Sequence, residues 1–196
     1  MSESSSRVAT HGIGEPSPWI VRFSPLVASG ARVLDLACGQ GRHARWFAGR
    51  GCRVLAVDRD VAALAALAGV PGVETAALDL ESGGWPLPGD RFDAIVVANY
   101  LHRPLFPDLL GALADDGALI YETFARGNEA FGRPSNPAFL LEPGELLRVV
   151  EGRLAVVAFE EGRVDADGHA AVVQRIAAVG ARRVSPPVLP SAGRMR

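Results

Sequence analysis

Short apolar runs alternate with helix-like segments along most of this 196-residue chain, and that alternation limits the folds open to it. The run FDAIVVANYL, which starts at Phe92, is almost continuously apolar, as expected for a strand with helices packed on both of its faces. Two further strand patterns, at 154–160 and 169–179, close the chain and are joined by the hairpin signal VDADG. The pattern predicts an α/β fold with a mostly parallel sheet, helices on both faces, and one antiparallel strand near the C-terminus.

Glycine and proline mark the limits of the expected elements and of the domain. We predict a flexible N-terminal segment at 1–16, a single domain at 17–180, and a disordered, proline-containing tail at 181–196. The expected strands are 32–37, 53–57, 73–78, 92–101, 118–124, 154–160 and 169–179, and the expected helices are 18–27, 41–48, 61–68, 105–114 and 145–150. The segments 83–90 and 125–139 have the composition of loops, and the second is long enough to suggest a function.

Composition excludes several classes of protein. A net charge of −2 and a pI near 6.1 give no electrostatic reason to expect a nucleic acid partner. The two cysteines and four histidines have no metal-ligand spacing, so no metal is expected. No signal peptide and no apolar run of membrane-spanning length is visible. The expectation is a soluble cytoplasmic protein without membrane contact, and the sequence leaves open whether it is a monomer or a homodimer.

The stretch VLDLACGQGRHA joins the first expected strand to the first helix after it. In open α/β sheets ligands bind outside the carboxyl ends of the strands, near the point where the strand order reverses. Gly39 and Gly41 leave the turn there almost without side chains, so that a ligand can approach the backbone and the N–H groups of the following helix. A tight strand–helix turn without a ligand would have the same glycines.

Two acids at the ends of the next strands strengthen the ligand hypothesis. Asp58 follows the second strand, about 20 residues after the glycine turn, where an acid binds ribose hydroxyls. Asp79 follows the third strand, where a carboxylate would accept an adenine amino proton. Each aspartate would also suit a helix N-cap.

Asp35, inside the first strand, discriminates between two nucleotide ligands. GQGRHA also fits the dinucleotide fingerprint GxGxxA, so an NAD-dependent dehydrogenase is one alternative. A carboxylate near the turn would repel a pyrophosphate but attract a cation. S-adenosylmethionine carries an ammonium and a sulfonium and has no phosphate, so Asp35 favours it.

These segments resemble the motifs of class I S-adenosylmethionine-dependent methyltransferases. VLDLACGQG is similar to the first motif, AVDRD to the second, LDLE to the adenine-contacting segment, and FDAIVVANYLHR and ALIYETF to the fourth and fifth strands. The resemblance covers about residues 17–180. It is nearest to small bacterial methyltransferases of the tellurite-resistance type, which have a similar ETF segment and glycine–asparagine–proline loop. The family fold is a Rossmann-like seven-stranded sheet whose last strand is inserted antiparallel.

The resemblance implies S-adenosylmethionine as the cofactor and assigns residues to its parts. Asp58 would hold the ribose with Arg59 beside the adenine, and the Asn99 carbonyl would accept from the ammonium. Asp79 and Leu80 would contact the adenine. The residues expected around the methionine part are Asp35, Ala37, Cys38, Gly39 and Gly41.

The methyl acceptor should lie beyond the fourth and fifth strands, where the polar candidates for catalysis are Tyr100, His102 and Glu122. His102 would be a general base or merely the first polar residue of the next helix, and Glu122 either functional or structural. The segment ANYL lacks the proline pair of DNA amino-methyltransferases, so we expect a small-molecule acceptor such as a thiol or a metalloid oxyanion. A non-catalytic S-adenosylmethionine-binding module remains an alternative, because binding does not require catalysis.

Overall fold

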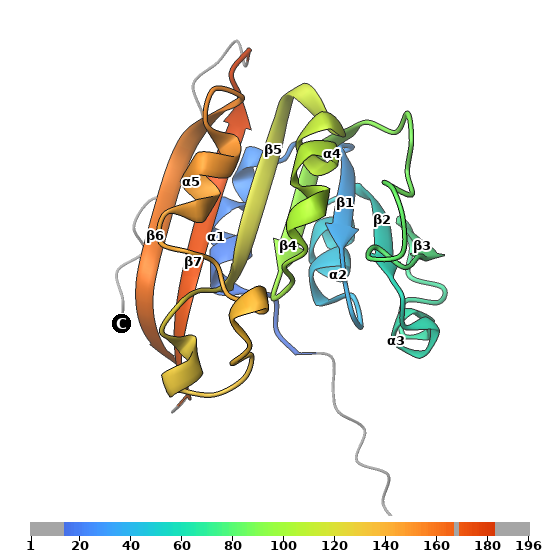
Figure 1. Cartoon of the computed structure of the whole chain (residues 1–196). Helices are drawn as coiled ribbons and strands as arrows, with labels where there is room; N and C mark the ends of the chain where they lie inside the picture. Colours follow the sequence, from blue (N-terminus) through green and yellow to red (C-terminus); the bar gives the residue numbers. More distant parts are fainter. Residues whose placement is uncertain (1–13, 167–168, 183–196) are drawn as a thin grey trace, which may run out of the picture.

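The fold is a seven-stranded mixed sheet with helices on both faces, seen in a computed structural model that describes residues 14–166 and 169–182 (Figure 1). The strand order is β3-β2-β1-β4-β5-β7-β6, and β7 alone runs antiparallel to its neighbours. Both the fold class and the antiparallel strand predicted from the sequence are confirmed. The strands are β1 Arg32–Leu36, β2 Arg53–Asp58, β3 Val73–Ala77, β4 Phe92–Ala98, β5 Leu113–Phe124, β6 Leu154–Ala166 and β7 His169–Gly180.

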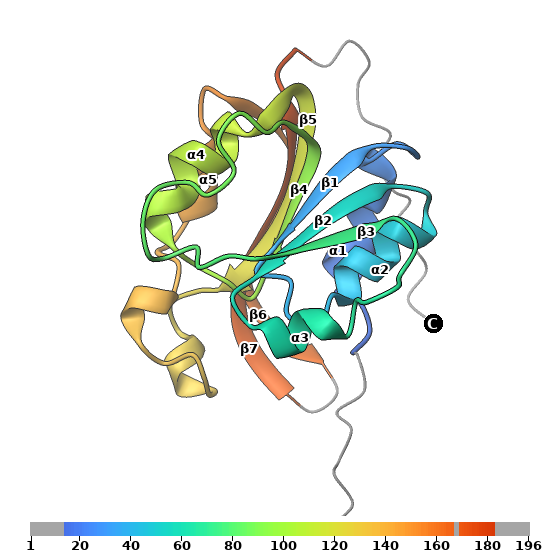
Figure 2. The ribbon, with the colours of Figure 1, turned by 90° about the vertical axis from the view of Figure 1, so that its right-hand side faces the viewer.

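The helices form two layers, one on each side of the sheet (Figure 2). The first layer holds α1, α2 and α3, and the second holds α4 and α5. The α-helices are α1 Pro18–Phe23, α2 Arg42–Gly49, α3 Val61–Ala65, α4 Phe106–Gly111 and α5 Glu145–Val150, and the 3-10 helices are η1 Ser24–Leu26, η2 Arg103–Leu105, η3 Asn128–Ala130 and η4 Pro137–Phe139.

Alternating side chains of the central strands point to opposite faces of the sheet and pack into two separate apolar cores. In β1, Val33 faces the layer of α1 to α3, whereas Leu34 and Leu36 face the layer of α4 and α5. Asp35 shares the side of Val33, so a carboxyl group is buried in the first core. The central strand β4 is buried on both faces, which explains the uninterrupted apolar run read in the sequence.

Several predicted boundaries are wrong, and long-range pairing explains the errors. The helix expected at 105–114 ends at Gly111, because β5 begins at Leu113 and pairs with Phe92. Strand β6 is longer than the predicted 154–160, because it pairs with β7 as far as Ala166 and His169. We predicted a flexible segment at 1–16 and a disordered tail at 181–196. Most of these residues, 1–13 and 183–196, lie outside the described residues. Within the described chain, no helix is both long and apolar enough to cross a membrane.

The end of β7 packs closely against the backbone near the start of β5. Four residues of β5, 114–117, lie between its pairings with Phe92 and Ala94, and they fold back towards the end of β7. A Cβ atom on Gly180 would lie 1.9 Å from the carbonyl oxygen of Asp115. The absence of a side chain at Gly180 is therefore required for this packing.

We expect the substitution Gly180→Ala to lower the free energy of unfolding by about 3 kcal/mol, because the backbone of β5 must move to admit the methyl group. The control is Gly111→Ala on α4, where a Cβ atom meets nothing within 4 Å. Urea denaturation of the three proteins measures the effect. Equal stability of Gly180→Ala and the wild-type protein would contradict this packing.

Candidate active site

The candidate site is a crevice at the carboxyl ends of β1 and β4, where the strand order reverses (Figure 1). Ala37 and Asn99 follow these two neighbouring strands, and both have a left-handed backbone, with φ of 54° and 57°. Such a conformation is rare for residues other than glycine and is found disproportionately at ligand sites. Both residues line the two cavities into which the crevice is divided.

The first cavity has a volume of about 280 Å³ and an acidic wall. The side chains of Asp58, Asp79 and Glu81 line it, and Arg59 is the cation among its lining residues. Leu80 contributes an apolar surface. Carboxylates accept hydrogen bonds and leucine packs against a flat ring, so this wall suits a nucleoside with hydroxyl and amino donors.

Asp58 connects the ends of β1 and β2 while it lines the first cavity. One carboxylate oxygen accepts from the Gly39 N–H at 2.8 Å, and the other accepts from the Asp60 N–H at 2.9 Å. Asp60, and not Asp58, caps α3 through the N–H groups of Ala62 and Ala63. The carboxylate of Asp58 has lone pairs to spare for a ligand. The helix N-cap alternative for Asp58 is thus wrong.

Asp79 is likewise engaged locally without capping a helix. Its carboxylate accepts from the Glu81 N–H at 2.9 Å, which fixes the turn after β3. The chain then runs to β4 as a loop, as the sequence predicts. The turn places Asp79, Leu80 and Glu81 together on the wall of the first cavity.

The second cavity, of about 340 Å³, lies over the glycine turn, and among the described residues that line it none has a carboxylate side chain. Arg42 lines it, as do Cys38, Gly39 and Gln40. A Cβ atom on Gly39 would meet nothing within 4 Å, so the space before this glycine is open. A Cβ atom on Gly41 would lie 2.4 Å from the Leu67 side chain, so this second glycine serves packing.

Asp35 lies behind the turn and lines neither cavity. Asp35 is 1% exposed, and its Oδ2 atom has no hydrogen-bond partner within the described chain. Burial raises its pKa to about 7, an effect opposed by the Ala44 N–H and by Arg42. The sequence predicted a plain anion here. The structure instead shows a carboxyl group near its titration midpoint at neutral pH, which an added positive charge would ionise.

The two cavities together fit S-adenosylmethionine. Hydroxyl and amino donors of the nucleoside would meet the acidic first cavity, and the amino-acid carboxylate would meet Arg42 in the second. The open space at Gly39 leaves the backbone accessible to that end of the ligand.

The three polar candidates for catalysis are separated by the fold. Tyr100 lines the first cavity, where burial and then Glu81 raise its hydroxyl pKa, so it faces the nucleoside. Glu122 lies on the α1 face and is held by Arg175 at 3.0 Å, which accounts for its burial without catalysis. His102 is half-buried after β4, and its ring forms no hydrogen bond with the described residues. His102 is thus the candidate that retains a free ring at the end of β4.

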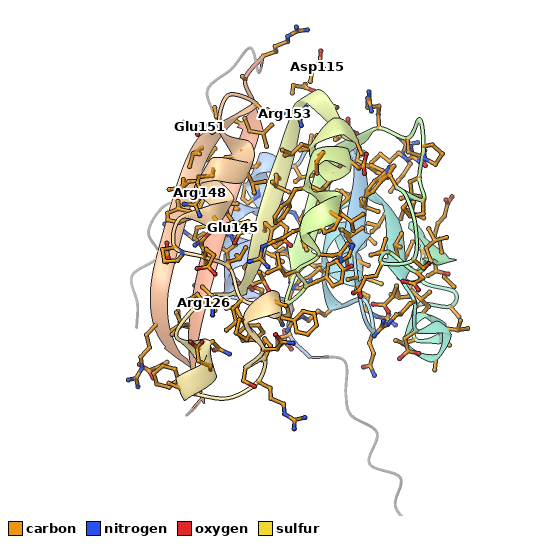
Figure 3. The ribbon with its side chains drawn as sticks, viewed as in Figure 1. Asp115, Arg126, Glu145, Arg148, Glu151 and Arg153 are labelled. Carbon is orange, nitrogen blue, oxygen red and sulfur yellow. The ribbon has the colours of Figure 1, made fainter. Side chains whose placement is uncertain are left out.

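The long loop 125–144 is fastened beside this end of the sheet. Arg103 binds Glu145 through two N–H groups, at 2.7 and 2.9 Å, and also donates to the carbonyls of Ala138 and Leu140. Arg126 pairs with Glu142 at 2.8 Å. Figure 3 shows Glu145 on α5 and Arg126 below it, near the lower end of the sheet. Arg103 therefore has a structural role, because it holds the loop 125–144 and the start of α5 in place.

A family model described as "Methyltransferase domain" matches residues 33–115, from β1 to the start of β5. This range contains the glycine turn, the acidic wall and Asn99. Residues 33–115 therefore match a methyltransferase domain. The cofactor that the crevice fits is S-adenosylmethionine.

The methyltransferase domain is similar to several proteins over most of its length. TehB from Haemophilus influenzae superposes with a TM-score of 0.69 at 17% identity, over 82% of this chain and 60% of that one. A TehB-like SAM-dependent methyltransferase from Corynebacterium glutamicum gives 0.58 at 23% identity, over 79% and 83%. An uncharacterized protein of Schizosaccharomyces pombe, UNK4.09, is 25% identical over 79% of this chain. The alignments cover 60% of the yeast protein and of TehB.

Sequence reasoning missed several residues that line the cavities. Gln40, Arg42 and His43 belong to the glycine-turn stretch itself, and Glu81 follows Asp79 by two positions. The signal that could have identified these residues is their position within or next to the recognised motifs. Gly14, outside any motif, also lines the second cavity, because Arg42 and His43 hold the chain near it.

We expect Asp35→Asn to stabilise the ligand-free methyltransferase domain at pH 8. The folded-state pKa of about 7 exceeds the value of 3.8 for a free aspartate, so Asp35 loses stabilising free energy as pH rises from 3.8 to 7. The variant should be more stable by roughly 2–4 kcal/mol at pH 8, with the difference shrinking towards pH 4.

Urea denaturation at several pH values measures this difference, with the exposed Asp116→Asn as control. A stability difference between Asp35→Asn and wild type that stays constant from pH 4 to pH 8 would show that Asp35 does not titrate as described.

Proposed function

We propose that this protein is an S-adenosylmethionine-dependent methyltransferase that acts on a small-molecule acceptor. The observation that carries the proposal is the divided crevice, acidic on the nucleoside side and cationic on the amino-acid side. It lies at the reversal of strand order between β1 and β4, inside the matched domain. The sheet order also departs from the 3-2-1-4-5-6 order of dinucleotide-binding sheets, which argues against the dehydrogenase alternative.

The residues of the crevice would perform binding and orientation. S-adenosylmethionine, when bound, supplies a methyl group on a sulfonium leaving group. Asp58 would accept from the ribose hydroxyls, and Asp79 and Leu80 would contact the adenine. The backbone carbonyl of Asn99 would accept from the ammonium. Holding both reactants in line is the main demand of methyl transfer, so no nucleophilic triad is required.

The acceptor would approach beyond β4, on the side of His102. An oxygen or nitrogen acceptor needs a base there, and the free ring of His102 is suited to that role. A thiol or a metalloid anion such as tellurite reacts without one. We favour a small acceptor because the segment ANYL lacks the proline pair of DNA amino-methyltransferases.

The experiment that tests the function is an acceptor screen with S-adenosylmethionine labelled on the methyl group. Thiols, selenite, tellurite, catechols and amines would be offered in turn, and label transfer is the result expected with one of these classes. Binding of S-adenosylmethionine without transfer to any acceptor would support the alternative of a non-catalytic binding module.

We expect Asp58→Ala to weaken the binding of S-adenosylhomocysteine by about 1–3 kcal/mol, because charged hydrogen bonds to the ribose are lost. Isothermal titration calorimetry measures the dissociation constant. The control is Asp60→Ala, which removes the neighbouring cap of α3 and no residue of the cavity.

Two results of the same calorimetry would count against the proposal. An unchanged dissociation constant in Asp58→Ala would remove the ribose assignment. Heat on addition of NAD, with none on addition of S-adenosylmethionine or S-adenosylhomocysteine, would overturn the methyltransferase function itself.

A further inference from the structure

Tyr121 is a buried residue of β5 that the proposed function does not use. It is 2% exposed and packs in the core on the side of α4 and α5, where its ring lies near that of Phe106. Its hydroxyl donates a hydrogen bond to the backbone carbonyl of Tyr100 at 2.7 Å. Burial raises the pKa of this hydroxyl, so it remains a protonated donor at physiological pH. The ring therefore connects the core to the segment that follows β4.

The segment that Tyr121 contacts forms part of the crevice. Tyr100 lines the first cavity, and Asn99, the residue before it, is exposed and lines both cavities. The Asn99 N–H donates to the backbone carbonyl of Glu122 at 3.0 Å, one residue beyond the last pair of β4 with β5. Two consecutive residues of β5 therefore hold the chain on both sides of the peptide group that joins Asn99 to Tyr100.

This peptide group has an unfavourable conformation on one side, because Asn99 has a left-handed backbone with φ of 57°. Such a conformation is costly for a residue with a Cβ atom and persists only where the surrounding contacts impose it. The carbonyl of the same peptide group is the one that the proposed function assigns to the ligand's ammonium. Its direction depends on the backbone angles of Asn99 and Tyr100, so contacts that fix those angles also direct the carbonyl.

We propose that Tyr121 is a positioning residue, whose hydroxyl holds the Asn99 carbonyl in the direction that accepts from the ammonium of S-adenosylmethionine. The inference rests on the proposed function, because it requires that ligand in the crevice. Tyr121 lines neither cavity, so it acts through Asn99 and Tyr100 and not by contact with the ligand. Without its hydroxyl the carbonyl would be ordered only when the ligand binds, and that ordering would lower the affinity.

Two substitutions at this position separate the hydroxyl from the ring. Tyr121→Phe removes the donor and leaves the ring to fill the core, so the fold is retained. Tyr121→4-aminophenylalanine keeps the ring and restores an N–H donor at the position of the hydroxyl. The control is Ser24→Ala, which removes another buried hydroxyl that donates to a backbone carbonyl, that of Val21 at 2.8 Å, outside both cavities.

Calorimetry would compare S-adenosylhomocysteine with its deaminated analogue, in which a hydrogen replaces the amino group and the carboxylate is kept. For Tyr121→Phe we expect roughly 2- to 10-fold weaker binding of S-adenosylhomocysteine and little change for the analogue, because only the first ligand has the ammonium. Tyr121→4-aminophenylalanine should recover most of the wild-type preference, and Ser24→Ala should leave it unchanged.

Three results would overturn this inference while the wild-type protein binds S-adenosylhomocysteine. They are equal weakening of both ligands by Tyr121→Phe, unchanged binding of both, and a preference that 4-aminophenylalanine does not recover. Failure of the wild-type protein to bind S-adenosylhomocysteine at all would instead overturn the proposed function, and the inference with it.

Discussion

The burial of one carboxyl group, Asp35, shapes the whole ligand site. A central strand with both faces covered normally holds apolar side chains, and here one position carries an acid with an unpartnered oxygen. The fold accommodates the acid by raising its pKa to about 7, so the carboxyl group is only partly ionised at neutral pH. Arg42 and Asp58, which act on that pKa in opposite directions, also line the two cavities. The state of Asp35 and the occupancy of the crevice are therefore electrostatically linked.

The rest of the site consists of strand ends held in register by a few polar contacts. Asp58 ties the glycine turn to the end of β2, and Asp79 fixes the turn after β3. On the opposite side, Arg103 fastens the loop 125–144 through Glu145 and two backbone carbonyls. These contacts preorganise the crevice, which is the main requirement for a reaction whose leaving group belongs to the cofactor.

Features that depend on local sequence were predictable. The alternation of strands and helices requires only the period of the apolar residues, and the cofactor residues follow strand ends that the apolar runs mark. Asn99 and Ala37, which were predicted to contact the cofactor, line both cavities. The hydrogen bond of His43 was not predictable, because its partner Ser17 lies 26 positions away.

The role of Glu122 also depends on a partner that is distant in the sequence. In the sequence it is an acid in an apolar run, which suggests either chemistry or an ion pair. Its partner, Arg175, lies on the antiparallel strand β7, and only the pairing of β5 with β7 brings the two together. Tyr100 was placed at the right end of β4 but assigned to the acceptor, because the sequence does not show which side of the crevice a residue faces.

The central claim is that a cationic ligand in the crevice ionises Asp35, and proton release on binding tests it most directly. Calorimetry of S-adenosylmethionine binding near pH 7, in two buffers of different ionisation enthalpy, counts the protons released. The account predicts that the wild-type protein releases about half a proton more than Asp35→Asn, as follows from a carboxyl group near its titration midpoint. Equal proton counts for the two proteins would contradict the link between Asp35 and the ligand.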